Sequence, residues 1–482
     1  MNYRLVLRML GQILRIEAVC LVLPLAVSWG TGGGDAMAFA VTIALSGVVG
    51  QALCCLPGGE RRMQARDGFA AVALSWIVMS AFGALPYVLS GAVPHYIDAF
   101  FETVSGFTTT GATILPEIES LPRGILLWRA QTQWMGGMGV LVLTLALLPK
   151  TGEGSVHLMR AESPGPIKTK LVPRVRDTAK ILYSIYITLT VLEIIFLMVA
   201  GMSLYDAATH AMTTISTGGF SVKNASIAAY DSLAINWIII VFMFLSGVNF
   251  SLLYYALCRN FKAVLHSEEL RFYTLQTVVA SALIAANLVV VGGQALNAKT
   301  VTDAVFQVVT VATTTGYATV DFALWPTLSC MILFVLMVTG ACAGSTAGGV
   351  KSIRVVLLVK NLRREVHNIL HPRVVQTIRV DGDRVEESTL SGVTLFFFAY
   401  ITLALIGALV VSWDNVGFTE AISASMTCVG NVGPALGAMG PTGNFGGLSA
   451  LSKIVLSFNM LLGRLEILPL LLMLFPSMWR KK

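Results

Sequence analysis

Four segments of the chain combine threonine, glycine and small residues in a pattern that suits the binding of a cation by backbone carbonyl groups. Each begins with an acidic residue followed by alanine and reaches a glycine thirteen residues later. The segments are DAFFETVSGFTTTGAT (98–113), DAATHAMTTISTGGFS (206–221), DAVFQVVTVATTTGYA (303–318) and EAISASMTCVGNVGPA (420–435). The same spacing in all four indicates an internal repeat. The alternative is four unrelated apolar segments in which glycine serves helix packing.

The length of each segment indicates how it sits in a membrane. The roughly ten residues before each Thr/Gly-rich end make a helix of about 15 Å, half the thickness of a hydrocarbon core. A backbone that stops there must line an aqueous cavity or be buried in protein. The acidic residue complements the positive helix end, so the negative end points to where a cation would sit. Because glycine can take φ > 0, successive carbonyls can face one axis and replace the hydration shell of an ion. We therefore predict a cation filter built from Thr109, Thr110, Gly111, Thr217, Gly218, Gly219, Thr314, Thr315, Gly316, Asn431, Val432 and Gly433.

The composition is that of a multi-pass membrane protein. The chain has 482 residues, of which 55% are hydrophobic and 12% charged, with a mean hydropathy of +0.76. The net charge of +7 would suit nucleic acid, but the positions of the basic residues argue against that partner. All but six of the 33 Lys and Arg residues fall in segments that we assign to one membrane face. The positive-inside rule then places both termini in the cytoplasm.

The fold class predicted is all-α, with four span, half-helix, span repeats in a pseudo-fourfold arrangement around a pore, after an N-terminal two-span hairpin. Counting two spans in each of the five units predicts ten spans, among them residues 124–148, 233–258, 326–350 and 451–476 as the second spans of the repeats. The expected units are the hairpin (1–66), pore repeat 1 (67–149), pore repeat 2 (150–265), pore repeat 3 with a gating loop and a cytoplasmic segment (266–388), and pore repeat 4 (389–482).

Small residues interrupt three of the second spans. We interpret WMGGMG (134–139) and FLSGVNF (244–250) as sites of close helix packing. GACAGSTAGG (340–349) differs, because four glycines in ten residues make a poor helix and favour a bendable loop. On the cytoplasmic side of the filter this loop is a candidate gate, and a simple packing break is the alternative. The gate residues are Gly340, Gly344, Ser345, Thr346, Gly348 and Gly349.

Arg464 is the other outlier, because a guanidinium inside a span is costly and normally faces water or a partner. We expect it just below the filter, where it would repel cations; the alternative is a structural ion pair, for which Glu466 is poorly placed at i,i+2. GSTAGGVKS resembles a P-loop but has one residue too many before Lys351, and His367 and His371 lack a third ligand. We therefore predict no nucleotide site, metal centre or enzyme activity, and find no Ser/His/Asp constellation.

The repeat motifs, with QWMGGMG, GSTAGGVKSIR and LGRLEIL, resemble the Trk/Ktr/HKT superfamily of potassium transporters, and within it the bacterial Trk subunits of the H and G type. The resemblance implies potassium uptake across the bacterial inner membrane, a homodimer, and a cytosolic ring-forming nucleotide-binding regulatory partner. It implies that Gly111, Gly219, Gly316 and Gly433 coordinate potassium, that residues 340–349 gate, and that Arg464 stands below the filter. Relatives that prefer sodium have Ser at the first filter glycine, so Gly111 favours potassium. Repeats 2 and 4 depart from Thr-Gly at Gly218-Gly219 and Val432-Gly433. Gated diffusion and obligatory proton- or sodium-coupled symport both remain open.

Overall fold

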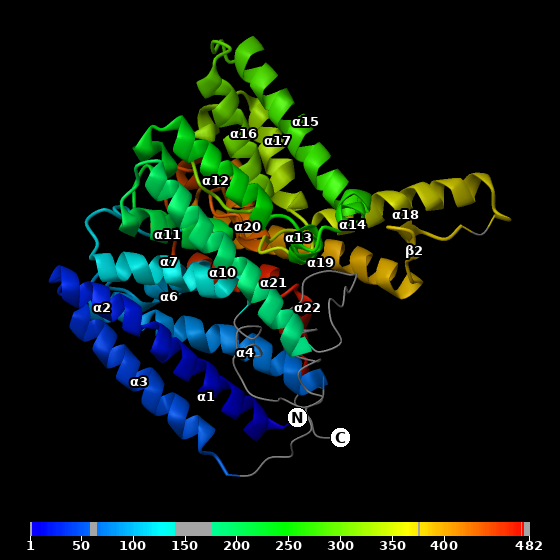
Figure 1. The fold of residues 1–482 in the computed structure, drawn as a ribbon. Helices are drawn as coiled ribbons and strands as arrows, with labels where there is room; N and C mark the ends of the chain where they lie inside the picture. Colours follow the sequence, from blue (N-terminus) through cyan, green and yellow to red (C-terminus); the bar gives the residue numbers. More distant parts are fainter. Residues whose placement is uncertain (1, 58–64, 140–174, 375, 474, 477–482) are drawn as a thin grey trace.

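The computed structural model describes residues 2–57, 65–139, 175–374, 376–473 and 475–476. The described chain is helical apart from one two-stranded antiparallel ribbon (Figure 1). This confirms the predicted all-α membrane fold.

The N-terminal hairpin consists of α1 (Tyr3–Cys20) and α2 (Val22–Thr31), which together form one span, and α3 (Ala36–Cys54), which packs against α1. Figure 1 shows the hairpin along one flank of the bundle, beside α4. The side chain of Asp35 at the start of α3 accepts a hydrogen bond of 2.5 Å from Ser28 of α2. This contact fixes the glycine-rich turn between the two spans.

Each repeat begins with a long helix and continues with a short one that leads to the predicted filter. The long helices are α4 (Ala65–Gly83), α10 (Val175–Val199), α15 (Glu268–Val290) and α19 (Glu387–Val411). In repeat 1 the short helix α5 (Leu85–Leu89) follows α4. The half-helices are α6 (Tyr96–Phe107), α11 (Leu204–Ile215), α16 (Ala298–Ala312) and α20 (Phe418–Gly430). They have 12, 12, 15 and 13 residues, slightly more than the ten predicted.

The predicted acidic residue lies in the first turn of three half-helices, at Asp98, Asp206 and Glu420. Repeat 3 differs, because α16 begins five residues before Asp303 and is capped by Asn297. The Asp303 carboxylate accepts a hydrogen bond from the Thr319 hydroxyl instead, at 2.8 Å. Asp303 is therefore not in the first turn of its helix. It holds instead the return strand of its repeat, by which we mean the residues that follow the filter glycine and lead away from the end of the half-helix.

The second helices of the repeats are shorter than predicted. They are α7 (Arg123–Gly137), α12 (Leu233–Ser246), α17 (Thr327–Thr339) and α21 (Ala450–Arg464). The chain continues from α12 into α13 (Phe250–Leu257) with a bend of 101°, and from α21 into the short α22 (Leu468–Met473). Within the described residues, six helices are long and apolar enough to span a membrane, or seven if the bent pair counts as one span. The second spans predicted as 233–258 and 326–350 are therefore interrupted, at Gly247 and Gly340. Residues 140–148 of the predicted span 124–148 lie outside the described residues.

The repeats close into a ring. Each half-helix packs against the first and second helices of its own repeat and also against the second helix of the preceding repeat. The contacts between neighbouring repeats are α11 on α7, α16 on α12, α20 on α17, and α6 on α21. Because the last of these joins repeat 1 to repeat 4, the four units surround a common centre.

The remaining elements join the repeats or lie at their edges. The helix α14 (Phe261–His266) precedes α15, and α18 (Ser352–Leu370) projects from the bundle with the ribbon of β1 (Arg379–Val380) and β2 (Asp383–Arg384) (Figure 1). Register pairs Arg379 with Arg384 and Val380 with Asp383. Four single 3₁₀ turns lie in the loops that follow the half-helices or the long helix of repeat 4: η1 (Ser226–Tyr230), η2 (Phe322–Leu324), η3 (Ser412–Asp414) and η4 (Gly437–Met439).

Candidate functional site

The four predicted filter segments follow the same backbone path. Four residues other than glycine have left-handed φ at one register, eleven residues after the acidic residue of each repeat: Thr109 (54°), Thr217 (54°), Thr314 (57°) and Asn431 (53°). A left-handed residue with a Cβ is uncommon and must be held by its surroundings. Two positions later the glycines also have positive φ, at Gly111 (84°), Gly219 (76°), Gly316 (86°) and Gly433 (105°). The internal repeat thus extends to the dihedral angles, and the glycines have the conformation that the sequence predicted.

The four glycines also form a closed cycle of contacts. A Cβ on each would lie against a carbonyl oxygen of the next repeat: Gly111 at 2.3 Å from Gly218, Gly219 at 1.8 Å from Thr315, Gly316 at 2.3 Å from Val432, and Gly433 at 2.6 Å from Thr110. Real Cβ atoms do not approach backbone oxygens so closely, so only glycine fits at these positions. The carbonyls that precede the glycines therefore surround one axis, each beside the neighbouring glycine.

A cavity of about 110 Å³ lies beside the predicted filter. All four glycines line it, together with residues of the loops that follow them, among them Pro434 and Asn444. The predicted filter therefore borders a hollow on the side of these loops.

Side-chain amides make contacts with the predicted filter segments of repeats 2 and 4. In repeat 2 the Gln133 amide donates to the Gly218 carbonyl oxygen at 2.6 Å, and its oxygen accepts from the Phe220 N–H at 3.0 Å. In repeat 4 the Asn431 amide donates to the Thr110 hydroxyl and to the Met460 carbonyl oxygen, both at 2.9 Å. The two amides lie in or beside the filter segments that depart from Thr-Gly. The motif alone did not reveal these contacts.

The loop after α17 is irregular, as predicted, and lies against the helix end of the filter. Its backbone is left-handed at Gly340 (65°), Gly344 (71°) and Gly349 (73°). The Gly348 N–H donates to the Thr314 hydroxyl at 2.7 Å, and the Thr217 and Thr346 hydroxyls are 3.3 Å apart. A Cβ on Gly348 would lie 2.4 Å from the Gly430 carbonyl oxygen. The loop therefore contacts the half-helix ends or filter residues of repeats 2, 3 and 4.

Other contacts tie the loop to its surroundings. The Cys342 N–H donates to the Gly247 carbonyl oxygen, and the Phe250 N–H donates to the Gly344 carbonyl oxygen, both at 3.0 Å. The segment FLSGVNF, interpreted from the sequence as a packing site in a continuous span, is thus a break that receives the loop. WMGGMG does pack closely, since a Cβ on Gly136 would lie 1.7 Å from the Phe107 carbonyl oxygen.

Arg464 ends α21 and reaches carbonyl groups on two other elements. Its guanidinium donates to the Thr346 oxygen of the loop at 2.7 Å, and to the Gly136 and Gly137 oxygens at the end of α7 at 2.7 and 2.6 Å. Glu466 pairs with Arg354 of α18 at 2.6 Å. Arg464 thus joins the loop to the end of α7 in repeat 1, a contact that sequence reasoning did not identify.

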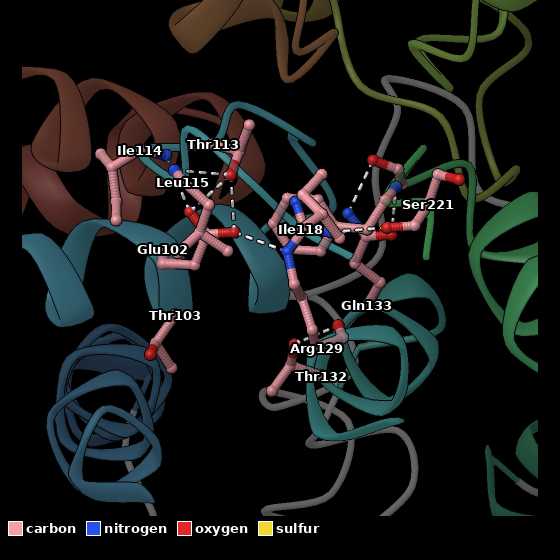
Figure 2. Close-up of polar contacts among 12 residues, drawn as sticks. Glu102, Thr103, Thr113, Ile114, Leu115, Ile118, Arg129, Thr132, Gln133 and Ser221 are labelled. Atoms are coloured by element: carbon pink, nitrogen blue, oxygen red, sulfur yellow. Dashed lines mark hydrogen bonds and ion pairs between the residues drawn. The ribbon is translucent and has the colours of Figure 1, made fainter. Parts of the chain in front are cut away.

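A buried ion pair lies behind the filter strands of repeats 1 and 2 (Figure 2). Arg129 of α7 and Glu102 of α6 approach to 2.6 Å and are 2% and 0% exposed. The sequence analysis left Arg129 among the six basic residues outside the cytoplasmic segments and did not single out Glu102. The signal available was a charged residue in each of two apolar helices, DAFFET and WRAQTQ, but their separation along the chain gave no indication that they meet.

The motifs that the sequence analysis set aside occupy ordinary structural positions. Lys351, the residue that made the loop resemble a P-loop, is buried, and its ammonium donates to the Ala347 carbonyl oxygen. The rings of His367 and His371 are 4.7 Å apart on the projecting α18.

A ring of four half-helices that converge on glycine-rich strands defines a class of membrane proteins, those that conduct or transport ions. The model of the TrkH family, described as cation transport protein, matches residues 36–481, and this chain belongs to that family. It is 38% identical over 496 residues to the Trk system potassium uptake protein TrkH of Halomonas elongata, and 38% identical over 490 residues to TrkH of Escherichia coli K12, with 100% of each chain covered. The crystal structure of the potassium transporter TrkH from Vibrio parahaemolyticus superposes with a TM-score of 0.89 at 34% identity, again over 100% of both chains.

Proposed function

We propose that this protein takes up potassium across the inner membrane of a bacterium, through a filter that the four repeats form together. The closed cycle of glycine and carbonyl contacts carries the proposal, because it surrounds one axis with four equivalent sets of backbone oxygens. Such oxygens replace the hydration shell of a cation. The relatives named above as potassium uptake proteins support potassium as the ion. The division into a hairpin and four repeats, with both termini in the cytoplasm, belongs to the same proposal.

The loop of residues 340–349 acts as the gate. It lies across the helix end of the filter in contact with three repeats, and each of its four glycines needs either a left-handed backbone or close approach to another segment. A chain of this kind changes its path at low conformational cost. Its hydrogen bonds to Thr314, Gly247 and Arg464 define the closed arrangement.

Two partners belong to the proposal. A second copy of the chain would cover apolar side chains that are exposed along α18, namely Val359, Leu362, Val366, Ile369 and Leu370. A cytosolic nucleotide-binding ring would dock on the basic face, where Lys360, Arg363, Arg364 and Arg379 line a surface hollow between α18 and the ribbon. The other basic stretch assigned to that face, residues 150–180, lies largely outside the described residues. Co-purification with such a ring protein, and a flux that responds to nucleotides only in its presence, test this part.

Flux measured in liposomes tests the function itself. Purified protein is reconstituted in vesicles loaded with potassium, and a membrane potential is set by ion gradients. A gated conduit passes potassium down its electrochemical gradient with no gradient of protons or sodium. If flux requires one of those gradients at every voltage, the protein is a coupled symporter and the conduit is refuted. If no potassium flux occurs in vesicles that contain folded protein, the proposed uptake function itself fails.

A further inference from the structure

The half-helices share a position from which a side chain faces the return strand of the filter. It lies four residues after the acidic start of each repeat and is occupied by Glu102, His210, Gln307 and Ala424. Glu102 accepts hydrogen bonds from the Thr113 hydroxyl at 3.0 Å and the Ile114 N–H at 3.0 Å. His210 contacts the Ser221 hydroxyl at 3.0 Å, and Thr113 and Ser221 are equivalent in the repeat.

The same position is weaker in the other two repeats. The Gln307 amide lies 3.5 Å from both the Thr319 hydroxyl and the Val320 carbonyl oxygen, the outer limit for a hydrogen bond. The Ala424 side chain cannot form a hydrogen bond. Side-chain hydrogen bonds from this position to the return strand are therefore strongest in repeats 1 and 2.

Arg129 joins the supports of these two repeats. Its Nε donates to Glu102 at 2.6 Å, while its Nη1 donates to the Ser221 carbonyl oxygen at 2.9 Å. The guanidinium also stacks over the Phe220 ring, 3.7 Å from its centre. Thr113, Glu102, Arg129, Ser221 and His210 thus form one continuous network behind two adjacent filter strands, part of which Figure 2 shows.

The Glu102–Arg129 ion pair is better explained by the geometry that it imposes than by the stability that it adds. A buried ion pair is a poor source of stability, because the cost of removing two charges from water offsets their attraction. Here both charged groups bond to segments that follow the filter glycines, Glu102 to Thr113 and Ile114 and Arg129 to Ser221. A planar guanidinium can hold two acceptors at a fixed distance where an ammonium cannot. The atoms they hold belong to residues two or three positions beyond Gly111 and Gly219.

We infer that Glu102 and Arg129 are positioning residues for ion selection, which set the separation of the first and second filter strands without contacting the ion. The inference rests on the proposed function, since it names residues that determine its selectivity. Loss of the pair releases the Thr113 and Ser221 segments, so the carbonyls can adjust to a smaller cation. The ratio of potassium to sodium flux then falls, while opening and closing of the loop are unaffected.

The test compares Glu102→Gln, Arg129→Gln, Arg129→Lys and Thr113→Val with the wild type in liposomes. We expect the potassium-to-sodium ratio to fall by roughly tenfold in the two Gln variants, the size of effect that one buried hydrogen bond to a charged group has. Arg129→Lys keeps the charge but not both contacts, so its ratio falls between these and the wild type. The matched control is Lys453→Gln, which removes an ion pair of equal length, 2.6 Å to Asp98, at the start of the helix that carries Glu102. Its ratio stays at the wild-type value.

Thr113→Val decides the outcome if the charge variants do not fold, because it removes only the hydroxyl bonded to Glu102. Folded variants that select potassium as well as the wild type does, or a control that loses selectivity equally, overturn the inference. If the wild type itself carries no potassium, the proposed function has failed instead, so the two failures are distinguishable.

Discussion

Replacing Arg464 by alanine separates two explanations of how this residue limits flux. The guanidinium is both a positive charge below the filter and a clamp, bonded to the loop at Thr346 and to α7 at Gly136 and Gly137. Either role predicts that Arg464→Ala raises potassium flux and leaves ion selectivity intact, because selectivity is set above both elements.

The size of the effect follows from the contacts. The guanidinium donates a hydrogen bond to the Thr346 carbonyl oxygen of the loop. A bond to a charged donor contributes about 1.5–3 kcal/mol, and since about 1.4 kcal/mol is a factor of ten, its loss favours the open loop by roughly 10- to 100-fold. The increase in flux is smaller if the loop is already open for part of the time.

Arg464→Lys distinguishes the clamp from the charge. Lysine keeps the positive charge, but its compact ammonium cannot span carbonyls on two elements as the planar guanidinium does. If the clamp dominates, Arg464→Lys conducts more than the wild type; if repulsion dominates, it conducts like the wild type. Arg123→Ala, at the opposite end of α7, serves as the control that removes an arginine away from the loop.

The assay is potassium flux and the potassium-to-sodium ratio in liposomes, with folding checked by size-exclusion chromatography. A folded Arg464→Ala protein with unchanged or lower flux would refute both explanations. Lost discrimination in that variant would show that Arg464 supports the filter.

Three further predictions follow from the same contacts. Gly111→Ser and Gly316→Ser weaken the preference for potassium over sodium, because a Cβ would lie 2.3 Å from a carbonyl oxygen of the next strand. The control is Gly382→Ser, at another positive φ but with open space around it. Unchanged selectivity in folded filter variants would argue against the filter. Deletion of Ala341 to Gly344 gives a potassium leak that no longer responds to a regulator, and a folded deletion with flux no higher than the wild type removes the gate assignment. Gly136→Ala lowers the free energy of unfolding by about 1–3 kcal/mol through overpacking against Phe107. Gly47→Ala in α3, with no atom within 4 Å, does not lower it. Equal melting temperatures for the two variants would contradict the packing.

The features predicted correctly from the sequence are those that repeat or that depend on local conformation. Four half-helices follow from a fixed spacing of acidic residue and glycine, and positive φ at the glycines follows from the missing Cβ. The irregular loop follows from its glycine content, since no other composition weakens a helix as strongly except one with proline. None of these inferences requires knowledge of what lies next to the segment.

The features that were missed depend on contacts between distant parts of the chain. Hydropathy remains high across the break at Gly247, so residues 233–258 read as one span although the helix bends there by 101°. The partners of Arg464 lie 118 residues or more away in the sequence, and Arg129 is 92 residues from Ser221. A polar side chain in an apolar helix indicates that a partner exists, but the ring of repeats decides which one.

The supports of the filter and the contacts of the gate lie on different sides of the filter strands. The Glu102, Arg129 and His210 network holds residues 113, 114 and 221, beyond the glycines, whereas the loop contacts Thr217 and Thr314, which precede them. The Thr217 hydroxyl also donates to the Ser216 carbonyl oxygen at 2.7 Å, and none of the network contacts named above involves the loop. In the proposed gate, opening would therefore change access to the filter without releasing the strands that follow its glycines. Variants in the network should then alter selectivity and leave gating unchanged, and variants of Arg464 or the loop should do the reverse.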